Sequence, residues 1–170
     1  MNIDAVLADA FTRVREQVPD VVAGLADDDL AWRPDPEANS IAWLIWHLTR
    51  VADDHVAEVA GTEQVWTSGG WYERFGLPFP AAAHGYGHSS ADVAAVRVPS
   101  GLLAGYHEAV AQAVLAYVGT LTPSDLDRVV DKQWDPPVTL GVRLVSVVND
   151  TSQHLGQAAY VRGLLERRTR

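Results

Sequence analysis

Four stretches of the chain repeat apolar residues at three- and four-residue steps, which is the spacing of one buried helix face. They run from Ile3 to Val18, from Ile41 to Val59, from about Ser100 to Val118 and from about Thr139 to Leu165. The pattern predicts four long α-helices. Helices with one apolar face must bury it against each other, so we expect an all-α fold, a four-helix bundle.

Residues near the predicted helix ends carry start and stop signals. Asn39 or Ser40 can cap the second helix by accepting a bond from its free amide groups, and Gly61 can end it. Pro19 falls late in the first helix, which should therefore kink there or end early. Thr122 followed by Pro123 resembles a further helix start, and we expect a short turn there.

The helical pattern breaks between Thr62 and Pro99, where glycine, proline and aromatic residues gather. A long irregular stretch inside a compact domain is usually functional or mobile. We predict a long crossover between the second and third helices that wraps the bundle and covers one end of it.

Length and charge narrow the class of protein. Residues 1–170 are enough for one domain with a sizeable core. The net charge of −9, from 13 basic and 22 acidic residues, argues against nucleic acid as a partner and against docking on an anionic membrane.

We see no signal peptide and no apolar run of membrane-spanning length, so we expect no membrane partner and a cytoplasmic location. The chain has no cysteine, so any thiol chemistry must use a thiol brought by a substrate.

Three polar residues in apolar helical segments are candidate metal ligands. Asp150 and His154 are four residues apart, so their side chains share one face of the fourth helix. His47 lies at the edge of the apolar stripe of the second helix, and facing helices of a bundle can bring it to that pair. Two imidazoles and one carboxylate are the ligand set of an open metal site. Hydrogen-bonded core residues are the alternative interpretation.

Several further residues have a functional and a plainer interpretation. Arg50, one turn after His47, is a candidate cofactor-binding residue that would hold an anionic group, and an exposed salt bridge is the alternative. His55 could replace one of the ligands or lie partly exposed beside Asp53 and Asp54. His84 and His88 lie in a glycine-rich loop, where they line a pocket mouth or belong to an ordinary loop.

The sequence also predicts the surroundings of two single residues in the helices. His107 follows a core tyrosine, so we expect it on the surface. Gly156 lies inside the fourth helix, where glycine destabilises by about 1 kcal/mol relative to alanine. Close approach of a neighbouring helix would explain it.

The chain resembles the DinB-like metal-binding bundle superfamily, and within it the branch of mycothiol-dependent maleylpyruvate isomerases and mycothiol S-transferases. The resemblance rests on Asn39-Ser-Ile-Ala-Trp-Leu-Ile-Trp-His47-Leu-Thr-Arg50 and on Asp150-Thr-Ser-Gln-His154-Leu-Gly-Gln. It implies a DinB-like bundle in which a helix-two histidine and two helix-four residues bind the metal, and these carry over as His47, Asp150 and His154. Many members have histidine in place of Asp150, and the isomerase branch has glutamate.

The resemblance also implies a cofactor and a reaction class. The metal would be divalent, zinc first and nickel or iron as alternatives. Mycothiol or a similar thiol would be the co-substrate, and the enzyme would be an S-transferase or isomerase acting on a small electrophilic molecule. A metal-dependent hydrolase and a non-enzymatic metal- or ligand-binding bundle stay open. No catalytic residue beyond the ligands is assigned. Members often pair through helix faces, so a homodimer is expected.

Overall fold

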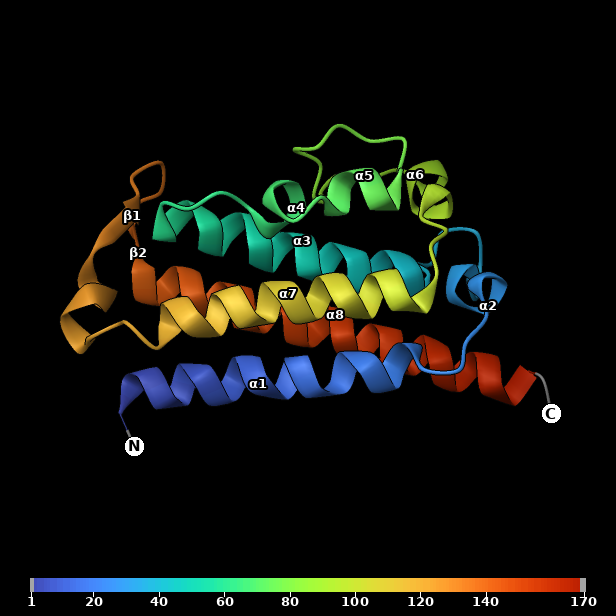
Figure 1. The fold of residues 1–170 in the computed structure, drawn as a ribbon, viewed down its shortest axis with the longest axis horizontal. Coiled ribbons are helices and arrows are strands. Elements are labelled where there is room, and N and C mark those ends of the chain that lie inside the picture. Colours follow the sequence, from blue (N-terminus) through green and yellow to red (C-terminus); the bar gives the residue numbers. More distant parts are fainter. Residues whose placement is uncertain (1, 169–170) are drawn as a thin grey trace.

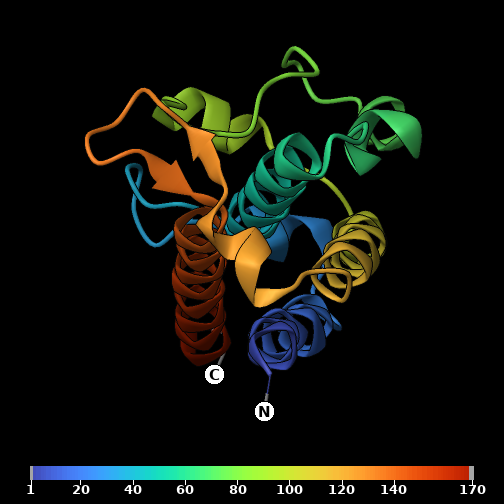
Figure 2. The ribbon, with the colours of Figure 1, turned by 90° about the vertical axis from the view of Figure 1, so that its left-hand side faces the viewer.

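Four long helices form the body of the molecule. In the computed structural model, which describes residues 2–168, they are α1 (Ile3–Val22), α3 (Ile41–Ala60), α7 (Ser100–Val118) and α8 (Leu140–Arg168). Seen along their axes, α1, α7, α3 and α8 follow one another around a square, and each packs against two neighbours (Figure 1, Figure 2). The expected all-α four-helix bundle is confirmed.

The connection between α3 and α7 is long because these two neighbouring helices run in the same direction (Figure 1). The chain must therefore return along the whole bundle before α7 can begin. The predicted crossover is present, but it lies along the outer side of α3 rather than over an end of the bundle (Figure 1). It contains three short helices, α4 (Val65–Ser68), α5 (Trp71–Phe75) and α6 (Ser90–Ala95). A further short helix, α2 (Asp27–Ala31), lies between α1 and α3.

The ends of α3 follow the sequence signals, whereas α1 continues past its proline. The Ser40 hydroxyl accepts a hydrogen bond from the Trp43 amide at 3.1 Å, and Gly61 ends the helix with φ of +69°. Helix α1 extends through Pro19 to Val22. Proline removes a single intrahelical hydrogen bond, and Val21 and Val22 bury their side chains beyond it.

A small hairpin links α7 to α8. The 3₁₀ helix η1 (Pro123–Asp127) is the short turn expected after Thr122. Strand β1 (Val129–Asp131) then pairs in antiparallel fashion with β2 (Val138–Thr139). The sequence did not predict these strands, because strands of two and three residues are too short to show an alternating pattern.

Helix α3 lies at the centre of the packing. Every residue from Ile41 to Arg50 is buried, because α7 and α8 flank the helix and the crossover lies along its outer side (Figure 1). Polar side chains on this half of α3 are therefore enclosed whichever way they point. This burial is what places His47 inside the molecule.

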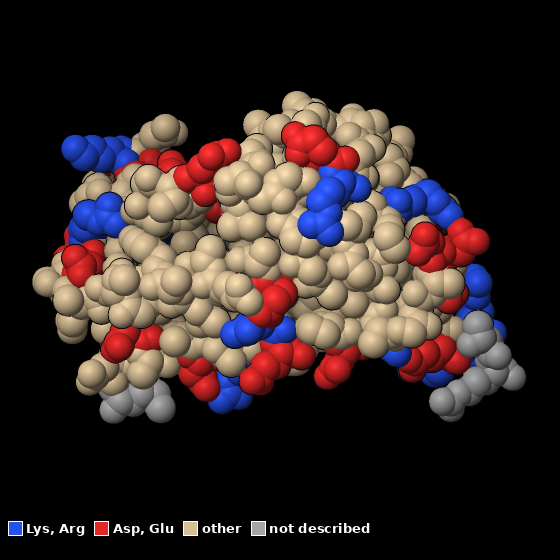
Figure 3. All heavy atoms as spheres, in the orientation of Figure 1, with Lys and Arg blue, Asp and Glu red and all other residues tan. Residues whose placement is uncertain are grey.

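The surface shown in Figure 3 carries acidic and basic side chains close to one another, without a large basic patch. None of the helices among the described residues is long and apolar enough to cross a membrane.

Candidate metal centre

The three predicted ligands come together between α3 and α8. His47, Asp150 and His154 each offer one ligand atom, and these atoms all lie within 4.8 Å of one another. The two imidazole rings meet edge to face with their centroids 4.6 Å apart. The helices run antiparallel (Figure 1), and the cluster joins the first half of α3 to the middle of α8.

The orientation of His47 is set by the crossover and by a tryptophan. Nδ1 of His47 hydrogen-bonds the main-chain carbonyl of His84. A carbonyl oxygen can only accept, so Nδ1 carries the proton and Nε2 keeps a free lone pair. The indole of Trp43 stacks on the imidazole, with a centroid distance of 4.6 Å and an interplanar angle of 15°.

His154 is oriented in the same way by its own helix. Its Nδ1 donates to the main-chain oxygen of Asp150 at 2.8 Å, which again leaves Nε2 available. Histidines that ligate metals usually donate their other ring nitrogen to such a carbonyl or carboxylate. Both histidines therefore have the second-sphere contact that a ligand needs.

Asp150 supplies the strongest sign that a cation fits this site. Its Oδ2 atom is buried and lies 3.3 Å from Nδ1 of His154, but that proton points to the main-chain oxygen, so Oδ2 has no hydrogen bond of its own. An unpartnered buried carboxylate oxygen is costly. A divalent ion between the carboxylate and the two imidazoles would satisfy it.

The charges of the three side chains influence one another. Burial lowers the pKa of His47, although its bond to the His84 carbonyl opposes the change. Burial raises the pKa of Asp150, but the neighbouring imidazoles, His154 first, outweigh it and leave the pKa below its usual value. Contact with the Asp150 carboxylate raises the pKa of His154. Near neutral pH the carboxylate is thus ionised and His47 is neutral, whereas the raised pKa of His154 favours its protonated form, so metal binding would have to displace that proton.

Arg50 is enclosed on all sides. Its side chain is 0% exposed and donates to the main-chain oxygens of Ala81 and Ala83, to the Gln64 amide oxygen and to the Tyr106 hydroxyl. It also lies 3.5 Å from Asp53. An anionic ligand would have to displace these partners. The arginine fastens the crossover to α3, and its cofactor-binding role stays a prediction.

The other candidate histidines lie around the cluster. Nδ1 of His55 accepts a hydrogen bond from Arg143 at 3.1 Å, because arginine can only donate, and His55 is not among the three converging ligands. His84 contributes its carbonyl to His47. Nδ1 of His88 lies 3.2 Å from the Trp43 ring nitrogen, which donates to it. The glycine-rich loop therefore covers the site and supports the side chains that form it.

Two structural predictions were wrong. His107 is buried, with 4% exposure, because this part of α7 faces the bundle interior, and its Nδ1 lies 3.0 Å from the Thr49 hydroxyl. A Cβ atom on Gly156 would meet nothing within 4 Å, so no neighbouring helix requires glycine there. Nothing in the structure explains this glycine.

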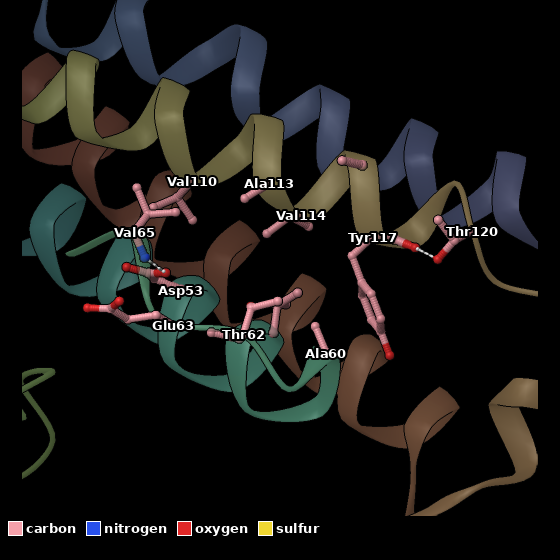
Figure 4. A pocket seen from close by; sticks show the side chains of 13 residues that line it. Asp53, Ala60, Thr62, Glu63, Val65, Val110, Ala113, Val114, Tyr117 and Thr120 are labelled. Carbon is pink, nitrogen blue, oxygen red and sulfur yellow. Dashed lines mark hydrogen bonds between the residues drawn. The ribbon is translucent and has the colours of Figure 1, made fainter. Parts of the chain in front are cut away.

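Cavities lie on both sides of α3. One of about 380 Å³ lies on its α7 side, where Val110, Ala113 and Val114 face Asp53 and Val65 (Figure 4). It is apart from the histidine cluster, which occupies the α8 side.

The second cavity, of about 430 Å³, lies between the second half of α8 and the segment that leads into α3, residues 34–39. It is lined by Leu44, three residues before His47, and by Gln157, three residues after His154. None of the three ligands lines the cavity, but these two residues place it about one helical turn from them.

A four-helix bundle with a long crossover, and with two histidines and a carboxylate converging from its second and fourth long helices, defines the DinB-like class of bundles. Within that class the chain belongs to the mycothiol S-transferase family, whose model matches residues 6–167. A solved structure, described as a conserved protein of locus from Enterococcus faecalis, is similar with a TM-score of 0.91 and 31% identity, covering 97% of this chain and 98% of that one. No curated protein matches the chain.

Proposed function

We propose that the chain is a divalent-metal-dependent S-transferase that joins the sulfur of mycothiol, or of a similar thiol, to a small electrophilic substrate. His47, Asp150 and His154 would hold the metal. The observation that carries the proposal is their convergence around a buried carboxylate oxygen that has no hydrogen-bond partner among the described residues. The family supplies the thiol and the transfer reaction.

A divalent metal bound by three protein ligands keeps an open position, where it would lower the pKa of a bound thiol toward neutrality. Zinc suits two imidazoles and a carboxylate, and nickel or iron would also be accepted by these ligands. The protein has no cysteine, so the reacting sulfur comes from the co-substrate. In the transfer the S–H bond breaks and sulfur forms a bond to an electrophilic carbon. In a substitution the leaving group departs with its bonding electron pair and the thiol proton goes to solvent, whereas in an addition the displaced π pair on the acceptor takes up a proton.

The protein's own residues would prepare this site. Trp43 and the His84 carbonyl hold His47 with Nε2 free, and the Asp150 main chain does the same for His154. The cavity one turn away would take the body of the thiol or of its partner. Its side chains Asn39 and Gln157 make no hydrogen bond to any described residue, so they are free to bind a polar ligand.

The proposal predicts activity that needs both metal and thiol. We expect metal-stripped protein to be inactive and to recover when Zn²⁺ is added, with mycothiol consumed together with a panel of small electrophiles. Asp150→Asn and His154→Ala should weaken Zn²⁺ binding by more than about 100-fold, since even second-sphere changes weaken binding by about 10–100-fold. Metal affinity is measured by competition with a chelator, and turnover by loss of free thiol.

Asp54→Asn is a matched control for Asp150→Asn. The two side chains have similar exposure, 31% and 33%, but Asp54 accepts a hydrogen bond from Gln64 and lies outside the ligand cluster. The Asp54→Asn variant should therefore bind Zn²⁺ as tightly as the wild type. A wild type that binds no divalent metal after reconstitution would sink the proposal. Turnover independent of thiol would favour the hydrolase alternative instead.

A further inference from the structure

The backbone of the crossover reaches the edge of the His47 imidazole at Gly85. This glycine follows His84 and has φ of +100°. A Cβ atom added to it would lie 2.5 Å from Nδ1 of His47 and 3.1 Å from Cζ2 of Trp43, and real Cβ atoms essentially never come closer than 3.0 Å to a neighbour. The position therefore requires a residue without a side chain as long as the ring stays in place.

The ring is held in place from the side of α3. Trp43 stacks on His47, and its indole nitrogen donates to Nδ1 of His88 at 3.2 Å. The His88 ring in turn stacks on Trp46 at 5.6 Å and lies 4.5 Å from Phe79. Moving His47 away from residue 85 would disturb this whole aromatic group.

The crossover is held in place as well. Arg50 donates hydrogen bonds to the main-chain oxygens of Ala81 and Ala83, just before His84. Its guanidinium is fully buried and also bonded to Gln64. The segment around residues 81–85 is thus fixed against α3, and it cannot withdraw from His47 without breaking these bonds.

We propose that Gly85 is a positioning residue for His47. It lets the His84 carbonyl reach Nδ1, which keeps the proton on that nitrogen and leaves Nε2 free on the side of Asp150 and His154. The consequence for metal binding rests on the proposed function. The contact between Gly85 and the imidazole does not, so it can be tested on metal-free protein.

Gly87 offers a matched control two residues away. It also has a positive φ, +76°, but a Cβ there would meet nothing within 4 Å. Gly85→Ala and Gly87→Ala therefore both place alanine in the left-handed region, and only the first collides with a side chain.

The first test is the denaturation midpoint of metal-free protein. We expect Gly85→Ala to lower the midpoint more than Gly87→Ala does, and most of the difference to disappear in a His47→Ala background, where the ring is gone. A difference that is equally large in both backgrounds would show that Gly85 does not act through His47.

The second test is the protonation of His47, read by ¹⁵N NMR of labelled histidine. Wild type and Gly87→Ala should show a neutral imidazole with the proton on Nδ1, whereas Gly85→Ala should show a mixture of the two tautomers. An unchanged tautomer in Gly85→Ala would overturn the proposal.

The third test is metal affinity, measured with Co²⁺ in competition with a chelator. Gly85→Ala should bind Co²⁺ about 10–100-fold more weakly than the wild type, the usual effect of losing a second-sphere contact, and Gly87→Ala should bind it nearly as well as the wild type. Equal affinities for the two variants would refute the positioning role. A wild type that binds neither Co²⁺ nor any other divalent metal would refute the proposed function, and the midpoint and NMR tests would still decide the role of Gly85.

Discussion

The imidazole of His107 lies inside the bundle with one nitrogen unpartnered. The Thr49 hydroxyl donates to the Ile45 carbonyl at 2.8 Å, so it accepts from Nδ1 of His107, and Nε2 has no partner among the described residues. A cavity of about 20 Å³ adjoins the ring, which is room for one water molecule. His107 is thus a neutral core residue in surroundings that oppose its protonation.

This burial predicts a pH dependence of stability. Burial lowers the pKa of His107 from 6.5 to about 4 in the folded protein. The unfolded chain therefore takes up this proton first, and the stability that the neutral imidazole provides is lost as the pH falls from about 6.5 to about 4. At pH 5 the loss from this residue should be about 2 kcal/mol.

The measurement is the free energy of unfolding at pH 7 and pH 5, for the wild type and for His107→Leu. The carboxylates contribute equally to both proteins, so the comparison isolates the histidine. The variant should lose about 2 kcal/mol less than the wild type on going to pH 5. Equal losses would mean that His107 does not resist protonation.

At the scale of the elements, the buried ion pair of Arg50 and Asp53 joins α3 to the crossover and to α7. The Asp53 carboxylate accepts hydrogen bonds from the amides of Val65 and Trp66 and from the Tyr106 hydroxyl. Arg50 lies 3.5 Å away and bonds the same hydroxyl. Burial raises the pKa of Asp53 despite these partners. The carboxylate is therefore stable in the interior only while its partners remain.

Removing Arg50 should destabilise the fold strongly. Breaking a buried ion pair from one side costs about 3–5 kcal/mol, because it leaves the other charge uncompensated. We expect this loss in unfolding free energy for Arg50→Met. Arg13→Met is the control, since Arg13 pairs with Asp9 on α1 with 70% exposure and should contribute less than about 1 kcal/mol.

A second substitution separates charge from packing. Adding Asp53→Asn to Arg50→Met removes the orphaned carboxylate and should restore part of the lost stability. If the two arginine variants unfold at the same denaturant concentration, the buried group does not fasten the crossover as we describe.

At the scale of the whole molecule, metal binding should be coupled to folding. The ligands come from two helices that meet only in the folded bundle, so an ion bound there stabilises the folded state alone. At a free Zn²⁺ concentration 100 times the dissociation constant, the gain is about 2.7 kcal/mol. For a chain of this length that corresponds to about 5–10 °C in the melting temperature.

Differential scanning calorimetry with and without Zn²⁺ checks this gain. The wild type should show the increase and His154→Ala should not. An equal increase in both proteins would place the bound metal elsewhere. A homodimer formed through helix faces also remains a prediction about the whole molecule. Measuring the mass of the protein in solution would test it.

The sequence by itself determined the helices and the local geometry of the ligands on α8. Helical spacing put Asp150 and His154 on one face, because that relation depends only on the 3.6-residue period. Capping by Ser40 and termination at Gly61 are equally local. The apolar stripes of four long helices were enough to predict the bundle, since each of them had to be buried.

Only the tertiary structure decided how His47 is held and which other polar residues are enclosed. The carbonyl that bonds its imidazole is 37 residues away in sequence, and Gly85 is required by a contact with that same ring. Arg50 lies inside because the crossover covers its face of α3, and His107 lies inside because its face of α7 packs towards α1 and α3. Such contacts depend on how distant segments pack against each other, and helix periodicity carries no information about that packing.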